Sequence, residues 1–273
     1  MSASAAYAEG LGRAFVGAAL FALPLFMTME MWQLAFTVDR LRLCTFLLVA
    51  LPLLVGLSHF AGFERTFGLL DDTLDAFAAI AVSSVAGAVI LLLFGAIAPG
   101  QPADEIAARI ALVSVPGAIG ALLADKQLGG DARRGEPDRT YGARLFLMSV
   151  GALFVALNVA PTEEMIFIAF QIAPWQAATL AVMSLAVLHA LLFWVDFPGR
   201  ETRRGEHPFW SILLRYSLAG YALCAGVSLF LLWTFGRTDG VGVGELTEFV
   251  VVLAFPAALG AGLAHMVVGE QRG

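Results

Sequence analysis

Charged residues are scarce in this sequence, and the shortage excludes an ordinary soluble domain. Only 14% of the 273 residues are Asp, Glu, Lys or Arg, whereas about 25% are charged in typical soluble proteins. Hydrophobic residues make up 59% of the chain, and the mean hydropathy is +0.83. We therefore expect an integral membrane protein whose main partner is the lipid bilayer, with no nucleic-acid partner. The net charge of −6 does not indicate basic partners, because few charges lie outside short loops.

Cysteine, lysine and the common metal motifs are also scarce. Cys44 and Cys224 both lie inside apolar runs, which argues against a disulfide framework and indicates buried free thiols. Lys126 is the only lysine and lies in a Gly-rich loop, so a retinal Schiff base within a membrane helix is excluded. No CxxC, HExxH or phosphate-binding glycine motif occurs, and no cofactor is predicted. Residues 1–12 carry no positive cluster, so no removable signal peptide is expected.

Long apolar runs fill most of the chain. A helix needs roughly 20 apolar residues to cross the hydrocarbon of a bilayer, and charged and Gly/Pro-rich breaks separate eight such runs. The predicted fold is therefore an all-α polytopic membrane protein. The predicted spans are 14–37, 43–62, 76–98, 106–124, 145–172, 175–195, 210–235 and 246–268.

Lys and Arg are distributed unevenly between alternate loops. Twelve of the 16 lie on the side that holds both termini and the loops 125–144 and 196–207, and four lie on the other side. Cytoplasmic loops of membrane proteins carry the excess of Lys and Arg. Both termini are therefore expected in the cytoplasm, with the chain in a bacterial inner membrane. A homo-oligomer is compatible with the sequence.

The sequence contains an internal duplication. Residues 105–125 align without gaps on 245–265 with seven identities, which include Pro116 with Pro256. We therefore expect two four-helix repeats, 1–125 and 144–273, joined by a Gly/Arg-rich cytoplasmic linker, 126–143. An even number of spans in each repeat makes them parallel, related by an axis along the membrane normal. The alternative is that apolar helices resemble one another by composition alone.

A second pair of matching stretches carries glutamate into predicted spans. Thr28-x-Glu30-Met31 in the first half matches Thr162-x-Glu164-Met165 in the second, where Glu163 adds another carboxylate. A carboxylate at membrane depth costs on the order of 3 kcal/mol, so such residues normally face a cavity, a partner or an ion.

Prolines precede both glutamate stretches. Pro24 lies four residues before Thr28, and Asn158 and Pro161 come shortly before Thr162. Proline removes a backbone donor and clashes with the preceding turn, so each helix is expected to be kinked or broken just before its glutamate. Thr162 is then predicted to cap a short half-helix that carries Glu163 and Glu164 in its first turn.

These features predict a pathway for protons or a small cation. Broken helices expose backbone groups and carboxylates to polar cavities in transporters, and the pair Glu30 and Glu164 is expected to share one pathway. The residues assigned to it are Glu30, Glu164, Glu163, Thr28, Thr162 and Asn158. A structural alternative is that the glutamates only complement the dipoles of the half-helices. A protein without any site, serving as a structural or assembly subunit, is the third possibility.

Other titratable residues have simpler interpretations. Asp71, Asp72 and Asp75 are interpreted as acidic residues that favour a helix N-terminus. His59 and His189 align approximately between the repeats and are expected to be interfacial or packing residues, about a membrane's thickness from the glutamates. No joint Glu/His metal site is predicted.

Two resemblances to known families accompany these patterns. Pro161-Thr162-Glu163-Glu164, followed by Phe167 and by His189 downstream, is similar to the double-glutamate motif of membrane-embedded CAAX-type proteases, which implies a protease using Glu163 with His189 as an alternative function. Ile168 stands where that motif has arginine.

The whole chain, with Met27 to Trp32 and Ala160 to Glu164, resembles an uncharacterised family of bacterial integral membrane proteins that is known as a domain of unknown function. That resemblance implies no activity.

Overall fold

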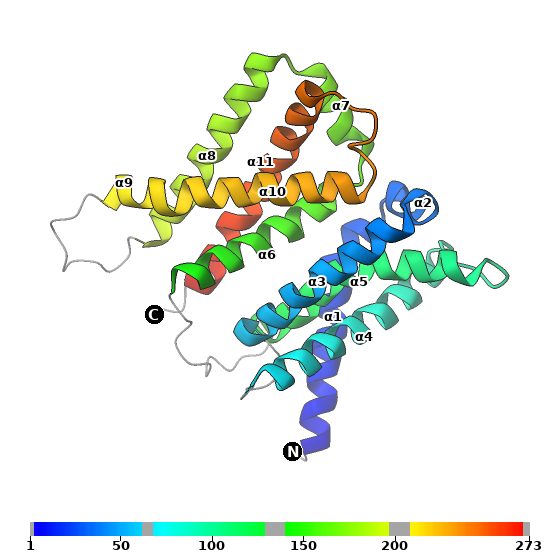
Figure 1. Cartoon of the computed structure of the whole chain (residues 1–273). Coiled ribbons are helices and arrows are strands. Elements are labelled where there is room, and N and C mark those ends of the chain that lie inside the picture. The colour runs from blue at the N-terminus through cyan, green and yellow to red at the C-terminus, as the bar shows by residue number, and fades with distance from the viewer. Residues whose placement is uncertain (1–2, 62–67, 129–139, 197–207, 270–273) are drawn as a thin grey trace. The chain divides into compact units, whose positions relative to one another are not determined.

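The computed structural model describes residues 3–61, 68–128, 140–196 and 208–269, and every regular element in these ranges is a helix (Figure 1). The elements are α1 (Ala3–Phe26), α2 (Met29–Thr37), α3 (Arg40–Ala61), α4 (Leu69–Leu93), α5 (Ala103–Leu128), α6 (Tyr141–Val159), α7 (Glu163–Gln171), α8 (Pro174–Asp196), α9 (Pro208–Ile212), the π-helical segment η1 (Leu213–Ser217), α10 (Leu218–Thr234) and α11 (Val243–Gly269).

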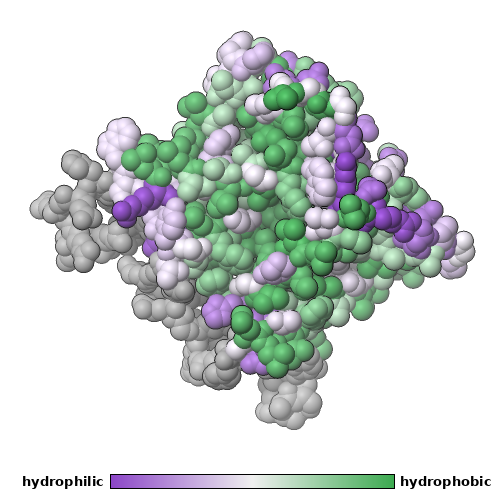
Figure 2. All heavy atoms as spheres, in the orientation of Figure 1, coloured by the Kyte–Doolittle hydropathy of each residue, from purple (hydrophilic) through white to green (hydrophobic). Residues whose placement is uncertain are grey.

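Eight helical stretches within these ranges are long and apolar enough to cross a membrane. One of them, Trp210–Thr234, combines α9, η1 and α10. Figure 2 shows that hydrophobic residues cover much of the described surface on the face drawn, as contact with lipid requires. The predicted all-α architecture with about eight spans is confirmed.

The chain forms two compact units, Met1–Pro137 (unit 1) and Asp138–Gly273 (unit 2). The division falls within the predicted linker 126–143, of which residues 129–139 lie outside the described residues. Each unit contains a long helix, a short half-helix and three further long helices in the same order.

In unit 1 the helix α5 packs against α1, α2, α3 and α4. Its middle is rich in Ala, Gly and Val, and residues 112–122 are all buried. Small residues let neighbouring helices approach closely in lipid, so this composition places α5 at the centre of the unit. In unit 2 the helix α11 has the same position, because it packs against α6, α7, α8 and α10.

One close helix crossing occurs in both units. A Cβ atom added to Gly17 of α1 would lie 2.6 Å from the carbonyl oxygen of Gly120 in α5. In unit 2, a Cβ atom on Gly151 of α6 would collide with the carbonyl oxygen of Gly260 in α11. Only glycine permits such backbone contact. Gly120 pairs with Gly260 in the gapless alignment of 105–125 on 245–265, whereas their partners Gly17 and Gly151 lie outside it.

The third long helix of each unit ends in the same way. Phe94 and Phe235 are the residues after α4 and α10, and each is followed by a glycine with positive φ, 71° at Gly95 and 73° at Gly236. Glycine is the residue that adopts this left-handed conformation without strain. This shared ending defines which residues of α4 and α10 are equivalent in the two units.

Candidate functional site

The first long helix of unit 1 is interrupted shortly before Glu30. The helix α1 ends at Phe26, and α2 begins at Met29. The hydroxyl of Thr28 donates a hydrogen bond to the carbonyl oxygen of Pro24 at 2.6 Å, which provides a partner for one of the acceptors at the end of α1. The predicted break before Glu30 is therefore confirmed.

Unit 2 has the same interruption before its pair of glutamates. The helix α6 ends at Val159, and α7 begins at Glu163. Pro161 lies between them and has no backbone N–H with which to continue the helix. The hydroxyl of Thr162 donates to the carbonyl oxygen of Val159 at 2.8 Å, as Thr28 does in unit 1.

The expected cap of the half-helices is only partly correct. Thr28 and Thr162 occupy the N-cap positions of α2 and α7, but neither side chain accepts a hydrogen bond from the first turn. Each hydroxyl instead donates backward to the preceding helix. The two threonines thus satisfy the carbonyl groups at the end of one helix and leave the N–H groups of the next available.

Each break receives a second donor from elsewhere in its unit. In unit 1, Nε1 of Trp32 donates to the carbonyl oxygen of Phe26 at 3.0 Å. In unit 2, a terminal nitrogen of Arg237 donates to the carbonyl oxygen of Pro161 at 3.0 Å. Asn158 donates to the carbonyl of Phe154 at 2.8 Å, while its Oδ1 is buried without a hydrogen-bond partner. Polar groups therefore gather at both breaks.

The three glutamates all lie in first turns, where the positive end of the helix dipole favours negative charge. Glu30 in α2 is half-buried, whereas Glu163 and Glu164 in α7 are exposed. Glu30 and Glu164 belong to different units. Each unit therefore has a carboxylate immediately after its broken helix.

The half-helices pack on the central helices through equivalent positions with different chemistry. In unit 1 the guanidinium carbon of Arg109 lies 4.4 Å from the ring centroid of Phe36. In unit 2 the rings of Phe170 and Phe249 meet edge to face, with centroids 5.2 Å apart. Phe170 follows Phe36 by 134 residues, the interval that also separates Gly151 from Gly17. Phe249 follows Arg109 by 140 residues, as Gly260 follows Gly120. Unit 1 thus buries a positive charge where unit 2 has an aromatic ring.

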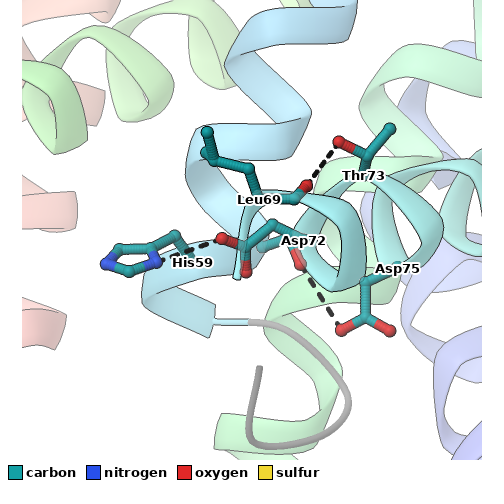
Figure 3. A network of polar contacts seen from close by, with 6 residues as sticks. His59, Leu69, Asp72, Thr73 and Asp75 are labelled. Atoms are coloured by element: carbon teal, nitrogen blue, oxygen red, sulfur yellow. Dashed lines mark hydrogen bonds and ion pairs between the residues drawn. The ribbon is translucent and has the colours of Figure 1, made fainter. Parts of the chain in front are cut away.

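A network of polar side chains lies where α3 and α4 meet, shown in Figure 3. We call Ser58, His59, Asp72 and Asp75 the α3–α4 corner. Nδ1 of His59 lies 3.2 Å from Oδ2 of Asp72, and the hydroxyl of Ser58 donates to Oδ2 of Asp75 at 3.4 Å. The side chain of His59 is 63% exposed, whereas Asp72 is only 2% exposed.

Asp71 and Asp72 lie in the first turn of α4, as predicted, but the sequence analysis did not anticipate the burial of Asp72. Its carboxylate is buried against α3, and Oδ1 has no hydrogen-bond partner. A signal for this burial exists in the sequence, because Asp72 shares a helical face with Ala76, Ala79 and Ser83. All three are buried. The first acidic turn alone did not distinguish Asp72 from the exposed Asp71.

Unit 2 has a different polar pair where α8 meets η1. Nδ1 of His189 lies 2.9 Å from Oγ of Ser217, and both residues are buried. The buried residues of α3 and α8 match when the two helices are superimposed in sequence, and this alignment pairs His59 with Phe193. His189 therefore lies one helical turn before the residue that is equivalent to His59. The approximate alignment of the two histidines is therefore off by one turn. A packing role between helices fits His189.

No group of three His, Cys, Asp or Glu side chains within the described ranges is arranged to hold a metal ion.

Comparison with known proteins identifies a family. One family, described as "Putative integral membrane protein (DUF2391)", matches residues 10–268 of the chain. This description names no activity, and no protease family matches the chain. No curated protein and no solved structure matches the chain.

Proposed function

The chain therefore belongs to this DUF2391 family of integral membrane proteins, and we propose that it moves protons or a small cation across the bilayer, with Glu30 and Glu164 as carboxylates of the pathway. The observation that carries the proposal is the repetition of one local structure. In both units a long apolar helix is interrupted directly before a glutamate.

The free-energy cost of placing an interrupted helix and a carboxylate in a membrane supports the assignment of Glu30 and Glu164 to the pathway. An interrupted helix within a membrane leaves backbone groups that neighbouring side chains or water must satisfy. Ionisable residues in membrane segments normally mark ion pathways. Thr28, Thr162 and Asn158 add hydroxyl and amide groups beside the breaks. A packing helix needs neither the interruption nor the carboxylate.

The arrangement of the units is part of the proposal. The two glycine crossings, the Phe-Gly helix endings and the equivalent contacts of Phe36 and Phe170 support descent of both units from one duplicated unit. We further propose that the repeats are parallel in a bacterial inner membrane, with both termini in the cytoplasm.

Flux measurements with purified protein in liposomes test the function. The wild type is expected to pass a proton or cation flux, and Glu30→Gln or Glu164→Gln should each remove most of it. Glu163→Gln should have a milder effect, because its counterpart in unit 1 is Met29. Each variant is first checked for folding by size-exclusion chromatography.

The same experiment distinguishes the structural alternative. If the folded variants pass every tested ion as the wild type does, the glutamates serve only the dipoles of their half-helices. The transport proposal then fails.

A further inference from the structure

Asp72 is the one acidic side chain that is buried within the described part of the chain. It is 2% exposed, Oδ2 faces His59 at 3.2 Å, and Oδ1 has no hydrogen-bond partner. Leaving a buried carboxylate oxygen unsatisfied is costly. A fold that keeps such a group in a membrane protein usually uses it.

His59 links this carboxylate to the surface. Its ring bonds to Asp72 through Nδ1, and 63% of its side chain is exposed (Figure 3). Imidazole can accept a proton on one nitrogen while it donates from the other. Protons can therefore pass between solvent and Asp72 without exposure of the carboxylate itself.

The α3–α4 corner lies at the end of unit 1 opposite the break. The helix α3 begins with Arg40 close after α2, and His59 lies 19 residues further, about 29 Å along the helix axis. That length is comparable to the thickness of the hydrocarbon core. Asp72 and Glu30 therefore lie toward opposite ends of the same unit.

A face of small residues on α4 connects these ends. From Asp72 it continues through Ala76, Ala79 and Ser83 to Gly87, and all are buried. A Cβ atom on Gly87 would lie 3.8 Å from the ring of Phe26, the last residue of α1 before the break. This face thus extends from the α3–α4 corner to the interrupted helix, and it packs against α5, since the same Cβ atom would lie 2.9 Å from Cγ2 of Val113.

Unit 2 has no carboxylate at the position equivalent to Asp72. The shared Phe-Gly ending aligns Ala76 with Ser217 and Gly87 with Ser228. The π-helical η1 adds one residue before that point, so Asp72 corresponds to Ile212, which is 7% exposed. The carboxylate is therefore a feature of unit 1, and general helix packing at this corner does not require it.

We propose that Asp72, with His59 as its partner at the surface, is the proton-binding group at the end of unit 1 opposite Glu30, which makes the proton the transported ion. This inference rests on the proposed function and identifies its ion. A metal ion would need several ligands together, and no set of three His, Cys, Asp or Glu side chains is arranged for one in the described residues. A proton needs only one acceptor oxygen.

Few charged groups lie on the described parts of the elements packed against Asp72. Asp71 and Asp75 lie on α4 itself, and His59 lies on α3. On α1, Arg13 is paired with Glu9 at 2.9 Å. No titratable residue occurs on α5 between Arg109 and Asp125.

Carbodiimide labelling tests proton binding directly, because carbodiimides add to protonated carboxyl groups in apolar surroundings. The full chain in liposomes is treated with dicyclohexylcarbodiimide at several pH values, and the labelled peptides are identified by mass spectrometry. Asp72 should be labelled, and its labelling should fall as pH rises. If Asp72 remains unlabelled at every pH, or is labelled equally at all of them, it is not the proton-binding group.

Flux measurements test its place in the pathway. Asp72→Asn should remove most of the proton flux, and His59→Gln should reduce it, while Asp71→Asn, a change at the exposed neighbour, should leave it unchanged. If Glu30→Gln stops the flux but folded Asp72→Asn does not, this inference fails and the proposed function stands. If the wild type passes no ion, the proposed function fails, and so does the assignment of the transported ion.

Discussion

At the scale of single residues, the hydrogen bonds at the breaks show how an apolar helix can be interrupted. Thr28 and Trp32 donate to carbonyl oxygens at the end of α1. Thr162 and Arg237 do the same for unit 2. An unsatisfied carbonyl costs several kcal/mol in hydrocarbon, so these donors stabilise the breaks.

Trp32→Phe should destabilise unit 1 by about 1 kcal/mol, because it removes the N–H that bonds to the carbonyl of Phe26. Thermal unfolding of the purified protein in detergent measures the change. The matched control is Trp175→Phe, at a tryptophan that is exposed and should tolerate the change. Equal melting temperatures for both variants would show that the Trp32 hydrogen bond adds no stability.

At the scale of elements, backbone contact between glycines sets the distance between the first and last helices of each unit. Gly17 meets Gly120 in unit 1, and Gly151 meets Gly260 in unit 2. These crossings fix α1 on α5 and α6 on α11, so the breaks at the ends of α1 and α6 are held on the central helices.

Gly120→Ala should destabilise the fold by about 1–3 kcal/mol, since its methyl group would overlap Phe21 and the backbone of Gly17. Gly260→Ala should do the same in unit 2. The controls are Gly12→Ala and Gly226→Ala, where nothing lies within 4 Å of an added Cβ. Those two changes should stabilise their helices slightly. A melting temperature of Gly120→Ala at or above that of Gly12→Ala would contradict the close crossing.

Sequence patterns could predict some elements and not others. Pro24 and Pro161 predicted the breaks in α1–α2 and α6–α7, and the lengths of the apolar runs predicted the membrane spans. The hydrogen bond from Arg237 to the carbonyl oxygen of Pro161 could not be predicted, because it depends on which helices become neighbours. The burial of Asp72 was missed, although its helical face carries a signal for it. The π-helical η1 was missed as well, since one added residue leaves the apolar run 210–235 unchanged.

At the scale of the whole molecule, the described residues contain eight apolar helical stretches in two units, and the chain is an integral membrane protein. In the topology that we propose, the even number of spans puts both termini on one side of the bilayer. The excess of Lys and Arg on that side supports the cytoplasm, although the loops 125–144 and 196–207 lie largely outside the described residues.

Cysteine accessibility tests this orientation in intact bacteria. A cysteine at position 135 should resist a membrane-impermeant maleimide, and one at Asp239, between α10 and α11, should react. The test requires replacement of Cys44 by serine, because Cys44 is exposed. The expectation of a buried thiol is thus wrong for Cys44 and confirmed for Cys224. Reaction at position 135 from outside the cells would reverse the proposed topology.

The π-helical η1 has a genetic consequence. Under the proposed duplication, the residue that it adds to unit 2 corresponds to a single codon. One residue turns an α-helix by about 100°, but the wider π-helical turn takes in the added residue, so Ile212 stays on the buried face, where Asp72 lies in unit 1. The rest of α10 keeps the buried face that it shares with α4. A π-helical turn therefore lets one copy of a unit carry an extra residue while the buried faces on both sides of the insertion stay alike.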